Sequence, residues 1–371
     1  MPRSRKHSGN NIEIRDSYTC FVISDHVSGL KVDKFHFCSW WYRKPLLFSR
    51  KVLIEIGLQV RISDLNVLKK QKDGKALKIA IVAPWISDGD QVEDVYPAIK
   101  EKKNARFIFN EDVTRDDTFD GGDGLTGCIL NFVNPICALP AEYQVSEGKV
   151  DLTVKIPEEC DLKKYPIYVR FAILAKRGRR ICYANTGPAK GIYAFDLKIN
   201  QPRNLPAPYK KDQLCEVGKS YCIHIVPSHY QISYYGGGPS LTVRLLEHTR
   251  YNEYVKGMVL FDQDIKPNAY QVVFNKREDL KNMFFTVFES EHIGMVAIGI
   301  AFLINIICTL MFLPLGQFRG NTAGLNCAPQ RLESIRMTQV QDPKTVDSTV
   351  NEKNGIQHQS SSTNHESSAT N

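Results

Sequence analysis

Residues 50 to 290 alternate between apolar and polar positions over many short runs. The clearest run is Lys51–Ser63, in which apolar side chains at every second position alternate with polar ones. This period of two predicts a strand that is buried on one face. Val150–Ile156 and Tyr193–Ile199 repeat it. Further strand-like runs are 77–85, 105–109, 128–133, 167–174, 221–226, 241–245, 270–274 and 283–288.

Helical patterns are scarce in this region. Glu93–Lys102 is the one candidate, and Pro97 interrupts it. Many short strands separated by turn residues indicate a mainly β protein built as a β-sandwich. Three prolines in the segment 201–210 favour a linker, because proline cannot join a central strand. We therefore predict two β-sandwich-like domains, a larger one over 51–200 and a smaller, membrane-proximal one over 211–290.

The segment 293–315 differs from the rest of the chain. Ile293 to Leu315 contains no Asp, Glu, Lys or Arg. As a helix it spans about 34 Å, enough for a hydrocarbon core of about 30 Å. This predicts one transmembrane α-helix. Ala297, Ala301 and Asn305 within it form a candidate surface for helix association, although a monomeric anchor is the simpler interpretation.

The two ends of the chain are polar. Residues 1–50 mix aromatic and basic side chains, which fits either a membrane interface or, as we prefer, an edge strand and loop packed on the first domain. The segment also lacks the apolar core of a secretory signal. Residues 316–371 have too little apolar surface to fold alone, so we expect a disordered tail.

Composition changes this picture little. The chain has 371 residues, 43% hydrophobic and 24% charged, with a net charge of +8. These values are those of an ordinary globular protein. The positive charge forms no dense basic stripe, so we expect no nucleic-acid partner.

The cysteines favour an oxidising compartment. An even number of the 10 cysteines precede the apolar segment, and candidates for disulfides are Cys128, Cys137, Cys160, Cys182, Cys215 and Cys222. The close pairs along the sequence are Cys128 with Cys137, Cys160 with Cys182, and Cys215 with Cys222. Buried free thiols are the alternative. No N-glycosylation sequon precedes the apolar segment, which weakly favours the cytosol.

Two polar clusters are candidate sites. An acidic, glycine-rich loop supplies carboxylates that could bind calcium as a cofactor, although a solvated loop is the preferred interpretation. Its acidic residues are Asp116, Asp117, Asp120 and Asp123. A basic hairpin tip with Arg177, Arg179 and Arg180 is a candidate for proteolytic cleavage or for contact with acidic lipids, although a plain exposed turn is the preferred interpretation.

No catalytic constellation is present, since the serine-hydrolase, zinc-protease, phosphate-binding and dinucleotide-binding motifs are all missing. We therefore expect a single-pass membrane protein, not an enzyme, with a β-rich ectodomain at the cell surface or in the secretory pathway. Its role would be recognition, as an adhesion protein, receptor or subunit of a membrane complex, with the bilayer and another protein as partners. One alternative is a cytosol-facing module on an internal membrane that acts as a tether or lipid-contacting adaptor. Another is a membrane-bound enzyme. The sequence does not specify an oligomeric state.

Overall fold

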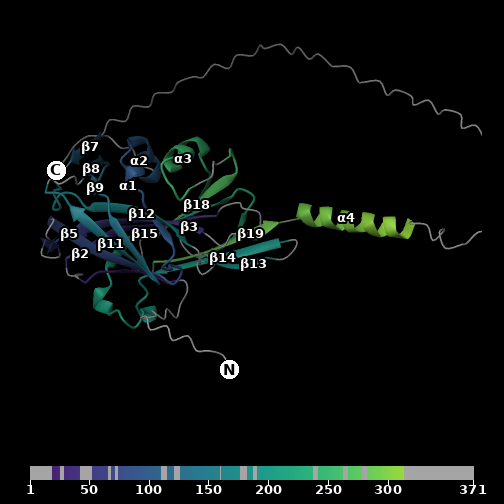
Figure 1. The fold of residues 1–371 in the computed structure, drawn as a ribbon, viewed down its shortest axis with the longest axis horizontal. Helices are drawn as coiled ribbons and strands as arrows, with labels where there is room; N and C mark the ends of the chain where they lie inside the picture. Colours follow the sequence, from purple (N-terminus) through teal and green to yellow (C-terminus); the bar gives the residue numbers. More distant parts are fainter. Residues whose placement is uncertain are drawn as a thin grey trace, which may run out of the picture. The chain divides into compact units, whose positions relative to one another are not determined.

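The computed structural model describes residues 19–25, 29–41, 52–65, 68–71, 74–109, 115–120, 126–158, 160–175, 182–186, 190–236, 241–261, 266–277, 282–291 and 293–312. The described residues up to Leu310 belong to one compact unit. It is mainly β, as the sequence predicts, and its described strands form two mixed sheets (Figure 1).

The first sheet has nine described strands. Its strand order is β10 (Glu142–Ser146), β11 (Lys149–Ile156), β5 (Gly74–Val82), β1 (Thr19–Ile23), β14 (Lys190–Ile199), β19 (Met283–Glu291) and β16 (Gln231–Gly236), with β13 (Cys182–Thr186) beside β14 and β4 (Lys69–Gln71) beside β5. Strands β1 and β14 run parallel, and the other described pairs of this sheet run antiparallel.

The second sheet has ten described strands. Its strand order is β17 (Thr242–Leu245), β18 (Tyr270–Arg277), β15 (Glu216–Pro227), β2 (Leu30–Trp40), β3 (Val52–Ile62), β12 (Ile167–Ala175), β9 (Ile136–Ala138), β8 (Thr126–Asn131) and β7 (Arg115–Asp120), with β6 (Gln91–Asp94) beside β12. The parallel pairs are β2 with β15 and β9 with β12.

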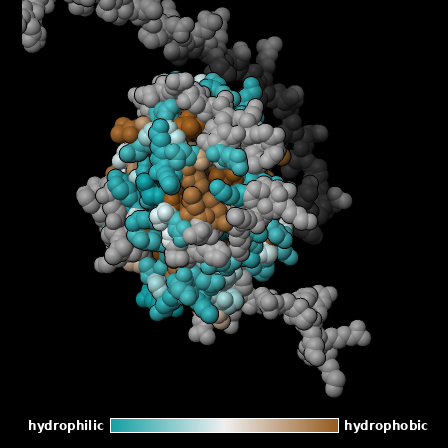
Figure 2. Space-filling view, turned by 90° about the vertical axis from the view of Figure 1, so that its left-hand side faces the viewer, coloured by the Kyte–Doolittle hydropathy of each residue, from teal (hydrophilic) through white to brown (hydrophobic). Residues whose placement is uncertain are grey.

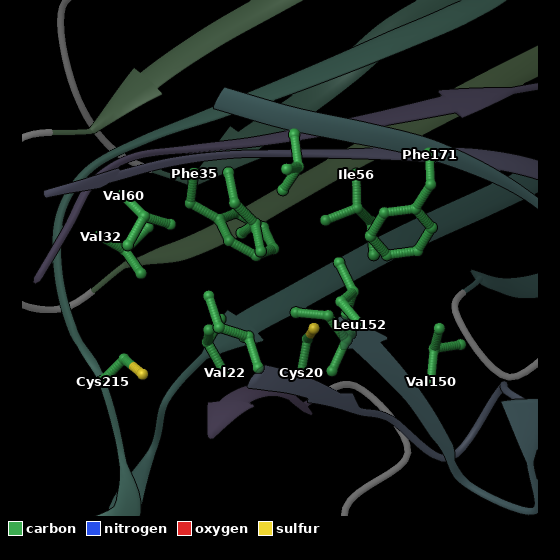
Figure 3. Close-up of a cluster of buried hydrophobic side chains, with 14 of the residues drawn as sticks. Cys20, Val22, Val32, Phe35, Ile56, Val60, Val150, Leu152, Phe171 and Cys215 are labelled. Carbon is green, nitrogen blue, oxygen red and sulfur yellow. The ribbon is translucent and has the colours of Figure 1, made fainter. Parts of the chain in front are cut away.

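The main core lies between the two sheets. Figure 3 shows side chains of β2, β3 and β12, such as Phe35, Ile56 and Phe171, pointing toward Val22 of β1 and Leu152 of β11. All five side chains are fully or almost fully buried. Burial of this apolar surface is the main force that holds the sheets together.

Helices cover the outer face of the second sheet. They are α1 (Tyr96–Ile99), α2 (Lys102–Phe109) and α3 (His248–Val255). Tyr251 and Tyr254 of α3 pack in one buried cluster with Trp40 of β2 and Ala172 of β12. Strands β2, β3 and β12 are therefore buried on both faces, whereas the sequence predicted one buried face for β3.

The predicted division into two domains does not match the strand pairing. Strand β15 pairs with β2 over Glu216–Ile225, and β19 pairs with β14 over its full length. The described strands on the two sides of residues 201–210 therefore share both sheets. The proline-rich segment includes a 3₁₀ turn over Pro202–Asn204, and Leu205 and Tyr209 pack near β1. Its prolines mark a turn against the sandwich and not a spacer.

Two other local predictions were wrong. Residues 105–109 form the end of helix α2 and no strand. Neither described strand of the first 50 residues is an edge strand, because β1 lies between β5 and β14 and β2 lies between β15 and β3. A single isolated run of apolar residues is compatible with either helix or strand, which explains the first error.

Helix α4 (Ile293–Phe312) follows β19 after one residue. Its described side chains, from Ala297 to Met311, are exposed. No helix within the described part of the chain is both long enough and apolar enough to cross a membrane. The predicted tail, 316–371, lies outside the described residues.

Candidate functional site

A cavity of about 470 Å³ lies on the outer face of the second sheet, beside helices α2 and α3. Strands β2, β15, β17 and β18 supply most of its lining. Arg170 of β12, Leu246 after β17, Ile108 and Phe109 of α2, and Tyr254 of α3 complete it. Its volume falls within the range of about 300–1,000 Å³ that is typical of small-molecule sites.

A β-bulge sets which residues of β2 line this cavity. The pairing of β2 with β3 shifts register between Val32 and Lys34. Val32 and Phe35 both belong to the core between the sheets, so the strict alternation is interrupted by one residue. Lys34, His36, Cys38 and Trp40 consequently share the outer face and line the cavity. Bulges commonly redirect side chains in this way beside binding sites.

A buried carboxylate lies beneath the cavity. Glu55 of β3 is fully buried, and its Oε1 accepts a hydrogen bond from Trp40 Nε1 at 2.9 Å. Its Oε2 accepts from Arg170 Nε at 2.9 Å, from Arg170 Nη2 at 2.6 Å and from Tyr254 Oη at 2.8 Å. An unpaired buried charge would be very costly, and this set of donors satisfies both oxygens. The Glu55 network thus ties β2, β3, β12 and α3 together.

A second set of contacts extends this network to His36. Arg170 Nη1 donates to Tyr168 Oη at 3.3 Å, and that hydroxyl lies 3.0 Å from His36 Nδ1. Because Tyr168 accepts from Arg170, its own proton is available to His36 Nδ1. When the hydroxyl donates to Nδ1, the neutral imidazole carries its proton on Nε2. The hydroxyl oxygen also has a second lone pair, with which it can accept from a protonated Nδ1. Gly57 makes room for this arrangement, since a Cβ there would overlap the Tyr168 hydroxyl.

Burial favours the neutral forms of His36 and Cys38. Burial, followed by the positive charges of Arg170 and Lys34, holds the pKa of His36 well below its usual range. Burial, followed by the negative charge of Glu55, raises the pKa of the Cys38 thiol well above its usual range. A neutral imidazole can donate or accept a hydrogen bond, whereas a thiol of raised pKa is a poor nucleophile.

The charged residues that line the cavity are all basic. They are Lys34, Arg170, Arg244 and Lys276, with neutral His36 beside them. Among the described lining residues there is no Asp or Glu. Arg170 is paired with Glu55, and Arg244 Nη1 lies 3.0 Å from Glu247 Oε1 at an exposed position. Lys276 Nζ lies 6.0 Å from the ring centroid of Tyr221, within reach of a cation–π contact.

Apolar and aromatic side chains form the rest of the lining. They are Trp40, Ile108, Phe109, Tyr221, Ile223, Ile225, Leu246, Tyr254, Val272 and Phe274, together with Cys38 and Thr242. His36 lies among them, 4.8 Å from Tyr221 and 6.0 Å from Phe109 between ring centroids. The cavity lining therefore combines apolar and basic side chains.

The structure does not test the two polar clusters predicted from sequence. The backbone of Asp116, Asp117 and Asp120 belongs to strand β7, which pairs antiparallel with β8. The side chains of these three residues, and Asp123, lie outside the described part. Arg177, Arg179 and Arg180 lie outside the described residues as well. Among the described residues, no group of three or more His, Cys, Asp or Glu side chains could hold a metal ion.

The predicted cysteine candidates are all buried. The structure brings together Cys137 and Cys160, whose sulfur atoms lie 2.8 Å apart. The sequence pairs Cys137 with Cys128 and Cys160 with Cys182. Cys137 is on β9 and Cys160 follows β11, so only the fold makes these two cysteines neighbours. On α4, Ala297, Ala301 and Asn305 are exposed, and the Asn305 carbonyl accepts a hydrogen bond from Thr309 Oγ1 at 2.7 Å.

Comparisons with known proteins place this site in no family. No family model and no curated protein matches the chain. Solved structures of an M1 zinc metallopeptidase are similar over part of their length: a two-domain E323A mutant bound to L-tryptophan, and the E323A mutant from Deinococcus radiodurans. Each is 10% identical with a TM-score of 0.28, and the match covers 70% of this chain. The chain spans less than half of those proteins, 43% and 42%, and similarity at this level carries no argument about function.

Sequence reasoning missed the central residues of the site. Glu55 looked like one of several solvent-facing residues on β3, and Arg170 lay unremarked within an apolar run. One signal was available: the alternation of β2 changes phase at Asp33 and Lys34, which is typical of a bulge. The pairing of Glu55 with Arg170 depends on the contact between β3 and β12, which sequence spacing does not encode.

Proposed function

We propose that the chain is a single-pass membrane protein whose β-rich head acts in recognition and not in catalysis. Helix α4 carries this proposal. Its described side chains are almost entirely apolar, yet they are exposed: Phe302 by 67%, Leu310 by 63% and Met311 by 80%. Apolar surface of this extent favours transfer out of water, and a bilayer core is the medium that would surround such a helix on all sides.

The proposed membrane span is Ile293–Leu315, which extends beyond the described side chains at both ends. Its length of about 34 Å matches a hydrocarbon core of about 30 Å. Strand β19 ends at Glu291, so the sandwich is joined to the span by a single residue. We therefore place the head close to the membrane surface.

Recognition is favoured over catalysis by the state of the polar groups at the cavity. Both carboxylate oxygens of Glu55 accept hydrogen bonds, which leaves this group poorly suited to act as a general base. The raised pKa of Cys38 disfavours a nucleophilic thiolate. These groups organise the sheet and helix α3 around a cavity that can hold a ligand.

A protein partner is a second part of the proposal. Figure 2 shows one face of the molecule on which an area of hydrophobic residues lies next to hydrophilic ones. An exposed apolar area with a polar rim is typical of interaction surfaces. We propose that the head binds another protein, and that the bilayer and this protein are contacted by different parts of the chain.

Extraction of membranes with alkaline carbonate tests the membrane span. The full-length chain should stay in the pellet. A variant with Ile300→Lys and Ile304→Lys should move to the supernatant, because each central lysine costs about 2.5–3.5 kcal/mol. The matched control, with valine at the same two positions, should remain in the pellet. Release of the unaltered chain by carbonate would refute the span.

Protease protection in intact microsomes tests which side of the membrane the head occupies. We propose that the head is exported, in line with the even number of cysteines before the span. The head should then be protected until detergent is added. Digestion without detergent would instead favour a cytosol-facing module.

A further inference from the structure

Two lysines enter the lining of the cavity from different strands of the second sheet. The β-bulge directs Lys34 of β2 to the outer face, and Lys276 of β18 lies on the same face beside Tyr221. We propose that the cavity binds a small amphipathic anion, a carboxylate or phosphate joined to an aromatic or aliphatic body. This inference rests on the proposed recognition function and names the ligand class of its site.

The charge of the lining favours an anion. Every charged residue among the described lining residues is basic. Lys34 and Lys276 supply ammonium groups, which donate strong charge-assisted hydrogen bonds to carboxylate or phosphate oxygens. The clustering of one sign of charge in a low-dielectric hollow also raises the local concentration of anions.

The imidazole of His36 supplies a neutral donor to the same cavity. Its Nδ1 is engaged by the Tyr168 hydroxyl, which in turn accepts from Arg170. When the Tyr168 hydroxyl donates to Nδ1, the ring carries its proton on Nε2, and that N–H group complements an anionic or carbonyl oxygen. The contacts of Tyr168 and Arg170 fix the orientation of this donor, so little ordering is required when a ligand binds.

The rest of the lining requires an apolar body on the ligand. Phe109, Tyr221 and Phe274 are among the aromatic rings around the cavity, and aliphatic side chains of β15 and β18 lie between them. Aromatic walls favour offset stacking or edge contacts with a flat apolar group. An inorganic anion would leave these walls in contact with water, so the two kinds of lining together select an amphipathic molecule.

Titration of the full-length protein in nanodiscs tests this inference, with empty nanodiscs as the blank. The ligands are 2-naphthoate, 2-naphthyl phosphate, neutral 2-naphthol and inorganic phosphate, followed by calorimetry. Both naphthyl anions should bind at least tenfold more tightly than naphthol, and inorganic phosphate should bind no more tightly than naphthol. Comparison of the two naphthyl anions identifies which anionic group is preferred.

Variants connect the binding to the named residues. Lys34→Met and Lys276→Met keep an unbranched side chain but remove the charge, and each should weaken naphthoate binding about tenfold while leaving naphthol unchanged. Lys31→Met is the matched control, since Lys31 is on β2 but pairs with Glu216 outside the cavity. It should bind naphthoate as the unaltered protein does.

Three results would overturn the inference: no binding of either naphthyl anion, equal binding of naphthol and naphthoate, or full affinity in both lysine variants. The outcome is independent of the membrane test. Selective naphthoate binding by a chain that carbonate extracts would refute the membrane span alone. A chain that resists carbonate but does not distinguish naphthoate from naphthol would refute the ligand class alone.

Discussion

Removal of either member of the buried pair of Glu55 and Arg170 should destabilise the sandwich strongly. Both side chains are almost completely buried, so Glu55→Leu leaves a guanidinium in the interior with no carboxylate partner. Breaking a buried pair in this way costs about 3–5 kcal/mol. We expect Glu55→Leu to lie at the upper end, because Trp40 Nε1 and Tyr254 Oη also lose their acceptor. Arg170→Met should lie at the lower end, because those two donors remain on Glu55.

The double variant provides the decisive measurement. Glu55→Leu with Arg170→Met removes both charges, and replacement of a whole buried pair by apolar side chains is often close to neutral. The double variant should therefore be more stable than Glu55→Leu alone, although the Trp40 and Tyr254 donors stay unsatisfied. The coupling free energy between the two substitutions should be at least about 2 kcal/mol.

Urea unfolding followed by tryptophan fluorescence measures these differences, because Trp40 reports directly on the network. In a thermal melt, the Glu55→Leu variant should lose roughly 10 °C, since about 2–4 °C corresponds to each kcal/mol in a domain of comparable size. The reasoning fails if Glu55→Leu costs less than about 1 kcal/mol. It also fails if the losses of the two single variants simply add in the double variant.

Three further predictions concern other sites. Gly57→Ala should destabilise the fold by about 1–3 kcal/mol, because the new methyl group meets the Tyr168 hydroxyl. In a urea titration, adding Tyr168→Phe to the Gly57→Ala variant should recover part of this loss. Burial holds the pKa of His224 at about 3, below its unfolded value of 6.5, so the unfolded state binds more protons between these values and stability falls as the pH drops below 6.5. Unfolding free energies at pH 7 and pH 5 should differ by about 2 kcal/mol more in the unaltered protein than in His224→Gln, and an equal difference in both would contradict this assignment. Treatment with oxidised glutathione should link Cys137 to Cys160, because the two thiols are oxidised to one disulfide as the glutathione disulfide is reduced to two thiols. Peptide mapping should show this link, and a link from Cys137 to Cys128 would count against the prediction.

The local patterns of the sequence carried most of the β structure. Alternation over Lys51–Ser63 and Val150–Ile156 predicted β3 and β11 within one or two residues, since the side chains of a strand project to opposite faces in turn. The same reasoning placed Glu55 in solvent. Its burial results from helix α3, which is close to 200 residues away in sequence, and no local pattern encodes that contact.

The organisation of the sandwich was less accessible for a related reason. Pairings such as β2 with β15 and β14 with β19 join segments on either side of residues 201–210. The prolines in that segment predict a linker between two domains, whereas in the structure the segment begins with a 3₁₀ turn next to Asn200. Asn200 has a positive φ of 51° and its side chain bonds to the backbone of Val22 and Cys215. An asparagine tolerates this conformation better than most residues, and this was the available indication of a tight turn.

The parallel pairing of β2 with β15 has a consequence for biosynthesis. A ribosome finishes Leu30–Trp40 long before it reaches Glu216–Pro227, and β2 cannot acquire this neighbour until then. The growing polypeptide therefore carries β2 with one edge unpaired until β15 has been synthesised. Unpaired strand edges recruit other chains, so we expect the nascent protein to depend on a chaperone until Glu216–Pro227 has emerged.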